Sequence, residues 1–269
     1  MYAPSAVRAY FRETEAGRLY VEEQGDGPLL ICLHGLGGGA YFFRGLGHRL
    51  KNRFRVLAFD LPGTGQSRAP GSKPFSLQAC GSALLEILAS QDPGTVSVLG
   101  HSMGTIIALL ANAEAAGRLR SMIFANGLPQ VTETITARLL ARAGRIRSLG
   151  MAGMGTEAAA GVFSAQSQSS RPETVALFAA MLDAHPAQAY LECLDALIQA
   201  SAWNVLPRVQ VPCFTITGSE DSYAPPAEVK RFGAQLPDWR SLAELRGCGH
   251  MPFFENAEEF AFEIAGFLK

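Results

Sequence analysis

The residues best suited to do chemistry are a serine, an aspartate and a histidine that lie far apart in the sequence. Ser102 is the centre of the segment GHSMG, which follows an apolar run and precedes the helix-forming run TIIALLANAEAA. In a sharp turn from a strand to a helix, a central serine is exposed, and Gly100 and Gly104 allow the backbone contacts that such a turn needs. Ser102 is therefore a candidate nucleophile.

A serine hydroxyl becomes a good nucleophile only when a base removes its proton. The chain has five histidines. His250 alone lies in a turn, GCGHMPFFE, between the last predicted strand and the closing predicted helix, and it is the predicted base. His34 and His101 adjoin glycines in two other loops, His48 lies in a predicted helix, and His185 lies next to a proline.

The base needs a carboxylate that orients it. Asp221 lies in TITGSEDS, three residues beyond the glycine that ends a predicted strand, and Glu220 is its nearest competitor. We favour the shorter aspartate, and the order Ser102, Asp221, His250 is typical of serine nucleophiles in strand-turn-helix folds. The preceding strand ends in FANGLP, where Asn126 is a neutral amide that cannot stabilise an imidazolium as a carboxylate does.

An anionic intermediate at Ser102 would need at least two backbone N–H donors aimed at it. Met103, directly after the serine at a predicted helix start, offers one, and Leu36 in the segment HGLGGG offers the other. The glycines of HGLGGG let the backbone approach a substrate closely. The segment lacks the GxGxxG spacing that opens directly onto a helix, so nucleotide binding is not expected.

Short apolar runs that alternate with helical patterns must position these residues. Such alternation indicates an α/β architecture, in which a parallel sheet carries helices on both faces. A hairpin at about residues 7–14 and 18–23 comes first. Further strands are predicted at residues 29–33, 55–59, 95–99, 119–125, 211–218 and 240–245, with helices near 41–50, 76–90, 103–116, 226–236 and 256–267.

The alternation stops between about residues 128 and 206, where no strand is predicted and only helical periodicity is found. The segments LGMAGMG and SAQSQSS interrupt that periodicity. We therefore predict a core formed by residues 1–127 and 207–269, with residues 128–206 inserted as a helical lid or cap.

Composition excludes several other classes of protein. With 23 Lys and Arg against 24 Asp and Glu, the net charge is −1 and no basic run stands out, so nucleic-acid binding is not expected. Apolar stretches are too short to span a membrane, and charged residues interrupt the N-terminal segment, so we expect a cytoplasmic protein without a membrane span. Five widely spread cysteines without a CxxC pair indicate buried thiols, and neither a metal nor another cofactor is expected.

Five motifs, in order, carry a resemblance to a known family: HGLGGG, DLPGTGQS, GHSMG, GSED and GCGHMPFFE. Over nearly its whole length the chain resembles the α/β-hydrolase superfamily. The resemblance implies an eight-stranded, mostly parallel sheet with a helical cap inserted after the sixth strand, and Ser102, Asp221 and His250 as catalytic triad. In that family the motif that begins at Asp60 is a structural turn, so its residues Asp60, Gly63, Gly65 and Ser67 receive no catalytic role.

The branch of the superfamily stays partly open. Haloalkane dehalogenases and epoxide hydrolases use an aspartate nucleophile, so Ser102 favours acyl chemistry. Carbon-carbon bond hydrolases share the serine triad but often have Trp where this chain has Met251. The GHMPFFE segment looks closer to small carboxylesterases and enol-lactonases, whereas cofactor-free haloperoxidases share the triad. A ligand receptor on the hydrolase fold is the alternative outside enzymes.

The predicted activity is hydrolysis of a small, largely apolar ester or lactone through an acyl-enzyme on Ser102. The side chains expected to line the substrate pocket are His34, Phe42, Met151, Met154, Trp203 and Met251. Arginines at positions 138, 142, 145 and 147 could bind a substrate carboxylate, but their helical spacing favours a solvated face. The sequence does not indicate the oligomeric state.

Overall fold

The computed structural model describes residues 7–71, 74–115 and 117–269. Its strands form one eight-stranded sheet in the order β1-β2-β4-β3-β5-β6-β7-β8. The first two strands pair antiparallel as a hairpin, β2 is also antiparallel to β4, and every other neighbouring pair is parallel. The strands are β1 Arg8–Thr14, β2 Gly17–Gln24, β3 Leu29–Leu33, β4 Arg55–Phe59, β5 Val96–His101, β6 Leu119–Ala125, β7 Cys213–Gly218 and β8 Trp239–Leu245.

Helices cover both faces of the sheet, as the α/β alternation predicts. The chain steps from β3 to β4 in one direction across the sheet and from β5 to β6 in the other. Because such crossovers are right-handed, α1 and α3 lie on opposite faces. The first packs against α11 and the second against α2. The bounds are α1 Arg44–Leu50, α2 Leu77–Ala89, α3 Met103–Asn112, α9 Pro226–Gly233, α10 Pro252–Glu255 and α11 Ala257–Phe267.

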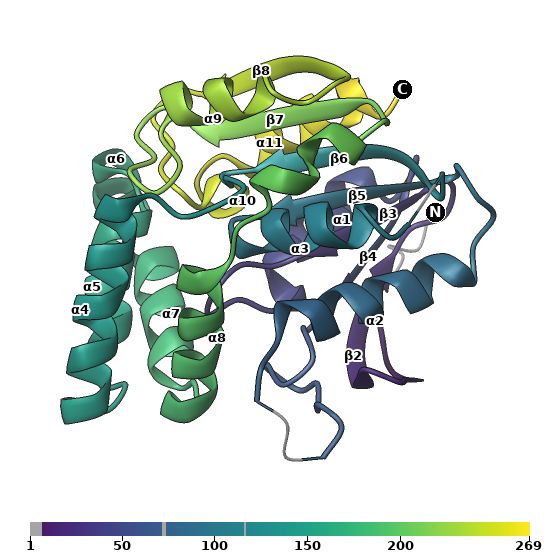
Figure 1. Ribbon diagram of the computed structural model, residues 1–269. Coiled ribbons are helices and arrows are strands. Elements are labelled where there is room, and N and C mark those ends of the chain that lie inside the picture. Colours follow the sequence, from purple (N-terminus) through teal and green to yellow (C-terminus); the bar gives the residue numbers. More distant parts are fainter. Residues whose placement is uncertain (1–6, 72–73, 116) are drawn as a thin grey trace, which may run out of the picture.

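The chain between β6 and β7 forms five α-helices, which we call the cap helices. Figure 1 shows four of them, α4, α5, α7 and α8, standing together to one side of the sheet. The longest, α4, packs against α8, and α5 packs against α7. Their bounds are α4 Glu133–Leu149, α5 Met154–Val162, α6 Ala165–Ser170, α7 Pro172–Asp183 and α8 Ala187–Gln199, and the 3-10 helix η2 Trp203–Arg208 follows them.

The element boundaries agree with the sequence predictions to within two residues for most strands. The helix expected near residues 41–50 is in fact two elements, the 3-10 helix η1 Ala40–Phe43 followed by α1. Asp60 Oδ1 accepts a hydrogen bond of 2.8 Å from the Ala40 amide, the first N–H of the 3-10 helix, which has no partner within that helix. All five cysteines are buried free thiols, as predicted.

In the part of the chain that the structure describes, no helix combines the length and the apolarity that crossing a membrane requires. The same residues contain no cluster of His, Cys, Asp and Glu side chains that could hold a metal ion.

Close packing of β3 against α3 gives a testable consequence at Gly104. A Cβ atom there would lie 2.3 Å from the carbonyl oxygen of Leu33, a backbone atom that cannot rotate away. Gly104→Ala should therefore lower the free energy of unfolding by about 1–3 kcal/mol, measured by urea denaturation. The matched control is Gly144→Ala, in an exposed stretch of α4 with no atom within 4 Å, which should stabilise by up to about 1 kcal/mol. Equal effects of the two substitutions would contradict this explanation.

Candidate active site

Ser102 occupies the turn between β5 and α3 in a strained backbone conformation. Its φ of 53° and ψ of −118° are rarely adopted by residues other than glycine. The turn is possible because Gly100 passes against Gly104, where an added Cβ would lie 2.4 Å from the Gly104 carbonyl oxygen. The glycines at these two positions are therefore required by close backbone contacts, as the GHSMG motif predicts.

The predicted base and acid are hydrogen-bonded to each other. The Nδ1 atom of His250, in the turn before α10, lies 2.9 Å from Oδ2 of Asp221, in the turn after β7. The other carboxylate oxygen of Asp221 accepts from the amides of Tyr223 at 2.7 Å and Ala224 at 3.0 Å. Burial alone would raise the pKa of Asp221, but the neighbouring imidazole and these donors lower it below the ordinary value. Asp221 is therefore ionised at neutral pH.

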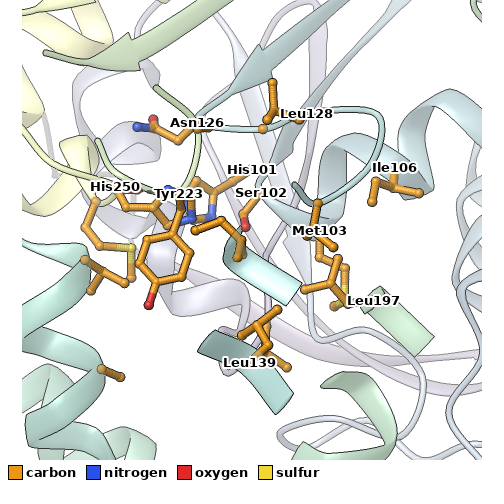
Figure 2. A pocket seen from close by; sticks show the side chains of 18 of the residues that line it. His101, Ser102, Met103, Ile106, Asn126, Leu128, Leu139, Leu197, Tyr223 and His250 are labelled. Carbon is orange, nitrogen blue, oxygen red and sulfur yellow. Dashed lines mark hydrogen bonds between the residues drawn. The ribbon is translucent and has the colours of Figure 1, made fainter. Parts of the chain in front are cut away.

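Ser102 and His250 line one cavity between the sheet and the cap helices (Figure 2). Among the described residues no hydrogen bond of 3.5 Å or less joins the Ser102 hydroxyl to the His250 ring. Such contacts are often long without substrate and tighten in the substrate complex. The structure thus brings the serine, the histidine and the aspartate to one site, with the histidine-aspartate hydrogen bond formed.

Both predicted oxyanion donors face the same cavity. Leu36 and Met103 are among its lining residues. Neither backbone N–H donates to a backbone carbonyl in the described part of the chain. Met103 is the first residue of α3, where the N–H groups of a helix have no partner within the helix. These two amides are consequently free to donate to a bound oxygen.

Of the six side chains predicted to line the substrate pocket, the structure places only Met251 in the cavity lining. Phe42 is 1% exposed and packs against Phe253, with ring centroids 5.2 Å apart. Trp203 is partly buried and packs against Phe232 of α9, with ring centroids 6.3 Å apart. Met151 and Met154 are buried among the cap helices. Phe42, Met151 and Met154 belong to the hydrophobic core, and Trp203 packs against it.

His34, the sixth predicted pocket residue, does not line this cavity either: it lines a neighbouring hollow and supports the HGLGGG segment. Its Nδ1 lies 2.8 Å from the Gly35 carbonyl oxygen, and its Nε2 accepts a hydrogen bond of 3.0 Å from the Leu61 amide. Burial lowers its pKa, so the ring is neutral. His34 therefore ties the HGLGGG segment to the turn that begins at Asp60.

That turn is structural, as the sequence predicts. Oδ2 of Asp60 accepts from the Gln66 amide at 2.8 Å, and the Ser67 hydroxyl donates to the Asp60 carbonyl oxygen at 2.6 Å. Gly65 has a φ of +52°, and a Cβ there would lie 2.2 Å from the Asp60 carboxylate. All of these groups are engaged in holding the turn.

The cavity lining that the sequence analysis missed is mostly aliphatic and comes largely from the cap. Ile135 and Leu139 are four residues apart on the buried face of α4, and that spacing was the available signal. Arg142 continues the same face and is 7% exposed, so its assignment to a solvated face was wrong. Further apolar lining residues are Ile106, Leu128, Val131, Val162, Leu182 and Leu197.

Asn126 has a role that the sequence analysis did not assign. Its Nδ2 donates to Oδ2 of Asp221 at 2.9 Å and to the Gly249 carbonyl oxygen at 3.1 Å. Its φ of 49° makes it, with Ser102, one of two non-glycine residues with positive φ among those described. Asn126 thus joins the acid to the loop that carries His250.

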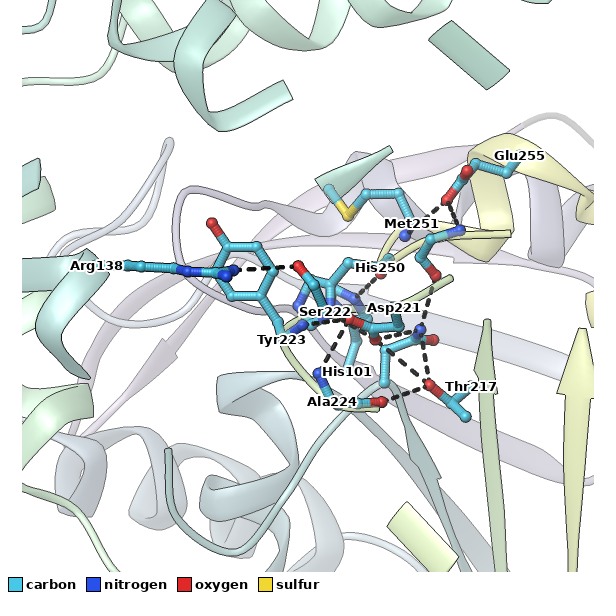
Figure 3. A network of polar contacts seen from close by, with 12 residues as sticks. His101, Arg138, Thr217, Asp221, Ser222, Tyr223, Ala224, His250, Met251 and Glu255 are labelled. Atoms are coloured by element: carbon cyan, nitrogen blue, oxygen red, sulfur yellow. Dashed lines mark hydrogen bonds and ion pairs between the residues drawn. The ribbon is translucent and has the colours of Figure 1, made fainter. Parts of the chain in front are cut away.

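Glu255 holds the same loop from its other side (Figure 3). Its Oε1 accepts from the amides of Gly249 at 2.9 Å and Met251 at 3.1 Å, the two neighbours of His250. Its Oε2 accepts from the Ser164 amide at 2.9 Å, between α5 and α6 of the cap. One buried carboxylate therefore links the histidine loop to the cap.

His101, next to the serine, is not a second base. Its Nε2 lies 3.0 Å from the His250 carbonyl oxygen. Burial and the neighbouring His250 ring lower its pKa to about 3. It is therefore neutral at every pH at which the protein is expected to work.

Comparisons with known proteins agree with this architecture. The model of the alpha/beta hydrolase family matches residues 30–264. The chain is 28% identical over 273 residues to polyketide synthase ThaQ of Burkholderia thailandensis, covering 98% of this chain but only 13% of that much longer protein. It is 26% identical to a pimeloyl-acyl-carrier-protein methyl ester esterase of Chromobacterium violaceum, over 93% of this chain and 98% of the relative.

Among solved structures, the enol-lactonase of Burkholderia xenovorans LB400 superimposes with a TM-score of 0.87. It is 21% identical in sequence, and the match covers 96% of this chain and 99% of that one. At this identity the similarity shows the fold. Together with the match of the family model to most of the sequence, it establishes that the chain belongs to the alpha/beta hydrolase family.

Proposed function

We propose that the protein is a serine hydrolase that cleaves a carboxylic ester or lactone through an acyl-enzyme on Ser102. The observation that carries the proposal is the hydrogen bond between His250 and Asp221 beside a serine held in a strained turn. The activities of similar proteins support ester chemistry, since an esterase and an enol-lactonase are among them. The mostly aliphatic cavity supports a substrate with an apolar body.

In the proposed reaction, Nε2 of His250 takes the proton of the Ser102 hydroxyl as its oxygen attacks the substrate carbonyl. The amides of Leu36 and Met103 donate to the oxygen that becomes negative, and Asp221 stabilises the imidazolium. When the tetrahedral intermediate collapses, the imidazolium returns its proton to the leaving alcohol and the ester C–O bond breaks. Water then attacks the acyl-enzyme with the same base, and the acid is released.

A fluorophosphonate is the sharpest test, because it reacts with activated serines. We expect one adduct per chain, located by mass spectrometry on the peptide that contains Ser102, and loss of p-nitrophenyl ester hydrolysis in proportion to labelling. An adduct on a different serine, or no adduct in a sample that hydrolyses esters, would refute the mechanism. The rates on p-nitrophenyl esters, lactones and vinylogous diketones then distinguish an esterase from a lactonase or a carbon-carbon bond hydrolase.

The pH dependence follows from the site. Only a neutral imidazole can accept the serine proton, so kcat/KM measured between about pH 5 and 8 should rise with pH. His101, with its pKa lowered to about 3, and His34, whose pKa burial also lowers, are already neutral there and contribute no step. Asp221 is already ionised because its pKa is lowered. Initial rates in overlapping buffers check this, and a flat profile over that range would count against His250 as the base.

A further inference from the structure

Arg142 is a buried cation in a cavity that is otherwise lined by uncharged and histidine side chains. It projects from α4 with 7% of its surface exposed. Among the described residues that line the cavity of Ser102 and His250, it is the only Lys, Arg, Asp or Glu. A charge removed from water is costly unless a counter-charge and hydrogen bonds compensate it. Groups that contact the guanidinium must therefore compensate its charge.

Its partners within the protein leave much of its capacity unused. One terminal nitrogen donates to the hydroxyl of Tyr190 at 3.3 Å and the other to the hydroxyl of Tyr223 at 3.1 Å. Its Nε has no hydrogen-bond partner in the described part of the chain. A guanidinium has five N–H donors, so at least three make no hydrogen bond within the described residues. Burial alone would lower the pKa of Arg142, but the two tyrosines raise it above its ordinary value, so the charge persists.

Glu157 compensates this charge only in part. Its carboxylate forms an ion pair with Nε of Arg142 at 3.8 Å, beyond hydrogen-bond distance, and pairs more closely with Arg145. The Glu157 side chain is 38% exposed, so water screens its field. Arg138 adds a further positive charge nearby, where it donates to Ser222 at 3.3 Å. Three arginines thus face one carboxylate.

Arg142 and Tyr223 also lie between the cavity and the protein surface. Both line a surface hollow of about 390 Å³ that contains Arg138, Arg145 and Glu157, and both line the catalytic cavity. The Tyr223 ring is 5.1 Å from the His250 ring, centroid to centroid, so Arg142 is separated from the proposed base by one side chain. The charged hollow would attract an anion, and Arg142 would meet it beside the reacting groups.

We propose that Arg142, with Tyr190 and Tyr223, binds a free carboxylate of the substrate, while the ester or lactone carbonyl of the same molecule lies at Ser102. The planar guanidinium offers paired donors that match the two oxygens of a carboxylate, and each tyrosine hydroxyl can add one more donor. The aliphatic lining then contacts the carbon chain between the two groups. The substrate class is an ester or lactone with an apolar body and an acidic end, which rests on the proposed function and narrows it.

The test compares monomethyl esters of dicarboxylic acids with neutral methyl esters of the same chain length. Monomethyl glutarate and methyl pentanoate are one such pair, and a series from succinate to suberate allows for the length of the site. We expect kcat/KM to be about 10- to 100-fold higher for the acidic member at the best length, as for a hydrogen bond to a charged group. A wild-type enzyme that prefers the neutral ester at every length would overturn the inference.

Variants test whether Arg142 causes the preference for acidic over neutral esters. Arg142→Met should reduce the acidic-to-neutral ratio of kcat/KM to about 1, and Arg142→Lys should retain part of it because the charge remains without the planar pair of donors. Arg147→Met is the matched control: it removes one positive charge from the same helix, at an exposed residue paired with Asp195, and should preserve the ratio. If Arg142→Met lowers both rates equally, Arg142 is structural and the inference fails.

A binding measurement separates this inference from the proposed function. Glutarate and its homologues should bind the Ser102→Ala variant, observed by calorimetry, and should bind at least 10-fold more weakly when Arg142 is also replaced by Met. If the wild-type protein cleaves no ester but dicarboxylates bind in a way that depends on Arg142, the hydrolase proposal is refuted and the carboxylate site stands. If the wild-type protein cleaves esters but dicarboxylates do not bind, the carboxylate site is refuted and the hydrolase proposal stands.

Discussion

Ser102→Ala should lower kcat for ester hydrolysis by about 10⁶-fold, which is the scale for loss of the nucleophile in a serine triad. The acyl-enzyme cannot form without the hydroxyl, and the residual rate would come from the amides of Leu36 and Met103 and from substrate binding alone. Because alanine fits the same turn as serine, the folded structure should persist, and KM should change far less than kcat. Steady-state kinetics on a p-nitrophenyl ester measure both.

The control is Ser222→Ala, which removes an exposed serine hydroxyl in the turn directly after Asp221. This variant should retain wild-type rates and the fluorophosphonate adduct, whereas Ser102→Ala should lose both. A Ser102→Ala protein that still turns over ester at more than about one thousandth of the wild-type rate would point to a different nucleophile or to catalysis by a bound water.

The residues of the proposed triad could be predicted to lie together because local signals place them. Gly100 and Gly104 mark a turn that only close backbone contacts explain, and Asp221 and His250 follow strands whose carboxyl ends meet at one edge of the sheet. A parallel sheet assembles its site there from loops far apart in sequence. The fold was predictable for the same reason, because strands and helices each have a local sequence periodicity and alternate along the chain.

The cavity was not predictable in the same way. Its lining depends on how α4 and α8 pack over the sheet, and sequence periodicity shows which face of a helix is buried without showing what covers it. Phe42 and Trp203 are apolar, yet Phe42 is buried in the core and Trp203 packs against it, outside the cavity lining. Arg142 shares its helix with exposed arginines, and only the packing of α4 shows that this one points inward.

Asn126 shows a different limit. From the sequence, Asn126 indicated only that the strand β6 is not followed by a carboxylate. In the structure its amide donates to the carboxylate that follows β7, so the two strand ends cooperate. A residue that acts by positioning another leaves no pattern of its own, because its role is defined by a partner 95 residues away.

Asp221→Asn should lower kcat by about 10⁴-fold while the protein remains folded. The asparagine oxygen can still accept from the Tyr223 and Ala224 amides, so the turn should keep its shape. The other position, 2.9 Å from Nδ1 of His250, would then hold an NH₂ donor. That donor would favour the tautomer with the proton on Nε2, which cannot accept the serine proton, and the neutral amide lacks the charge that stabilises the imidazolium.

Glu220→Gln is the matched control for this substitution. It removes one negative charge from the adjacent residue, whose carboxylate is exposed and whose Oε2 accepts only a long hydrogen bond of 3.4 Å from the Ala165 amide. Its kcat should stay within about twofold of wild type, since an exposed carboxylate that makes no hydrogen bond to the imidazole contributes little to its charge balance. Thermal unfolding of both variants verifies that they fold. If Glu220→Gln were the damaging change and Asp221→Asn the silent one, the acid would be Glu220, and the buried hydrogen bond to His250 would have a structural role only.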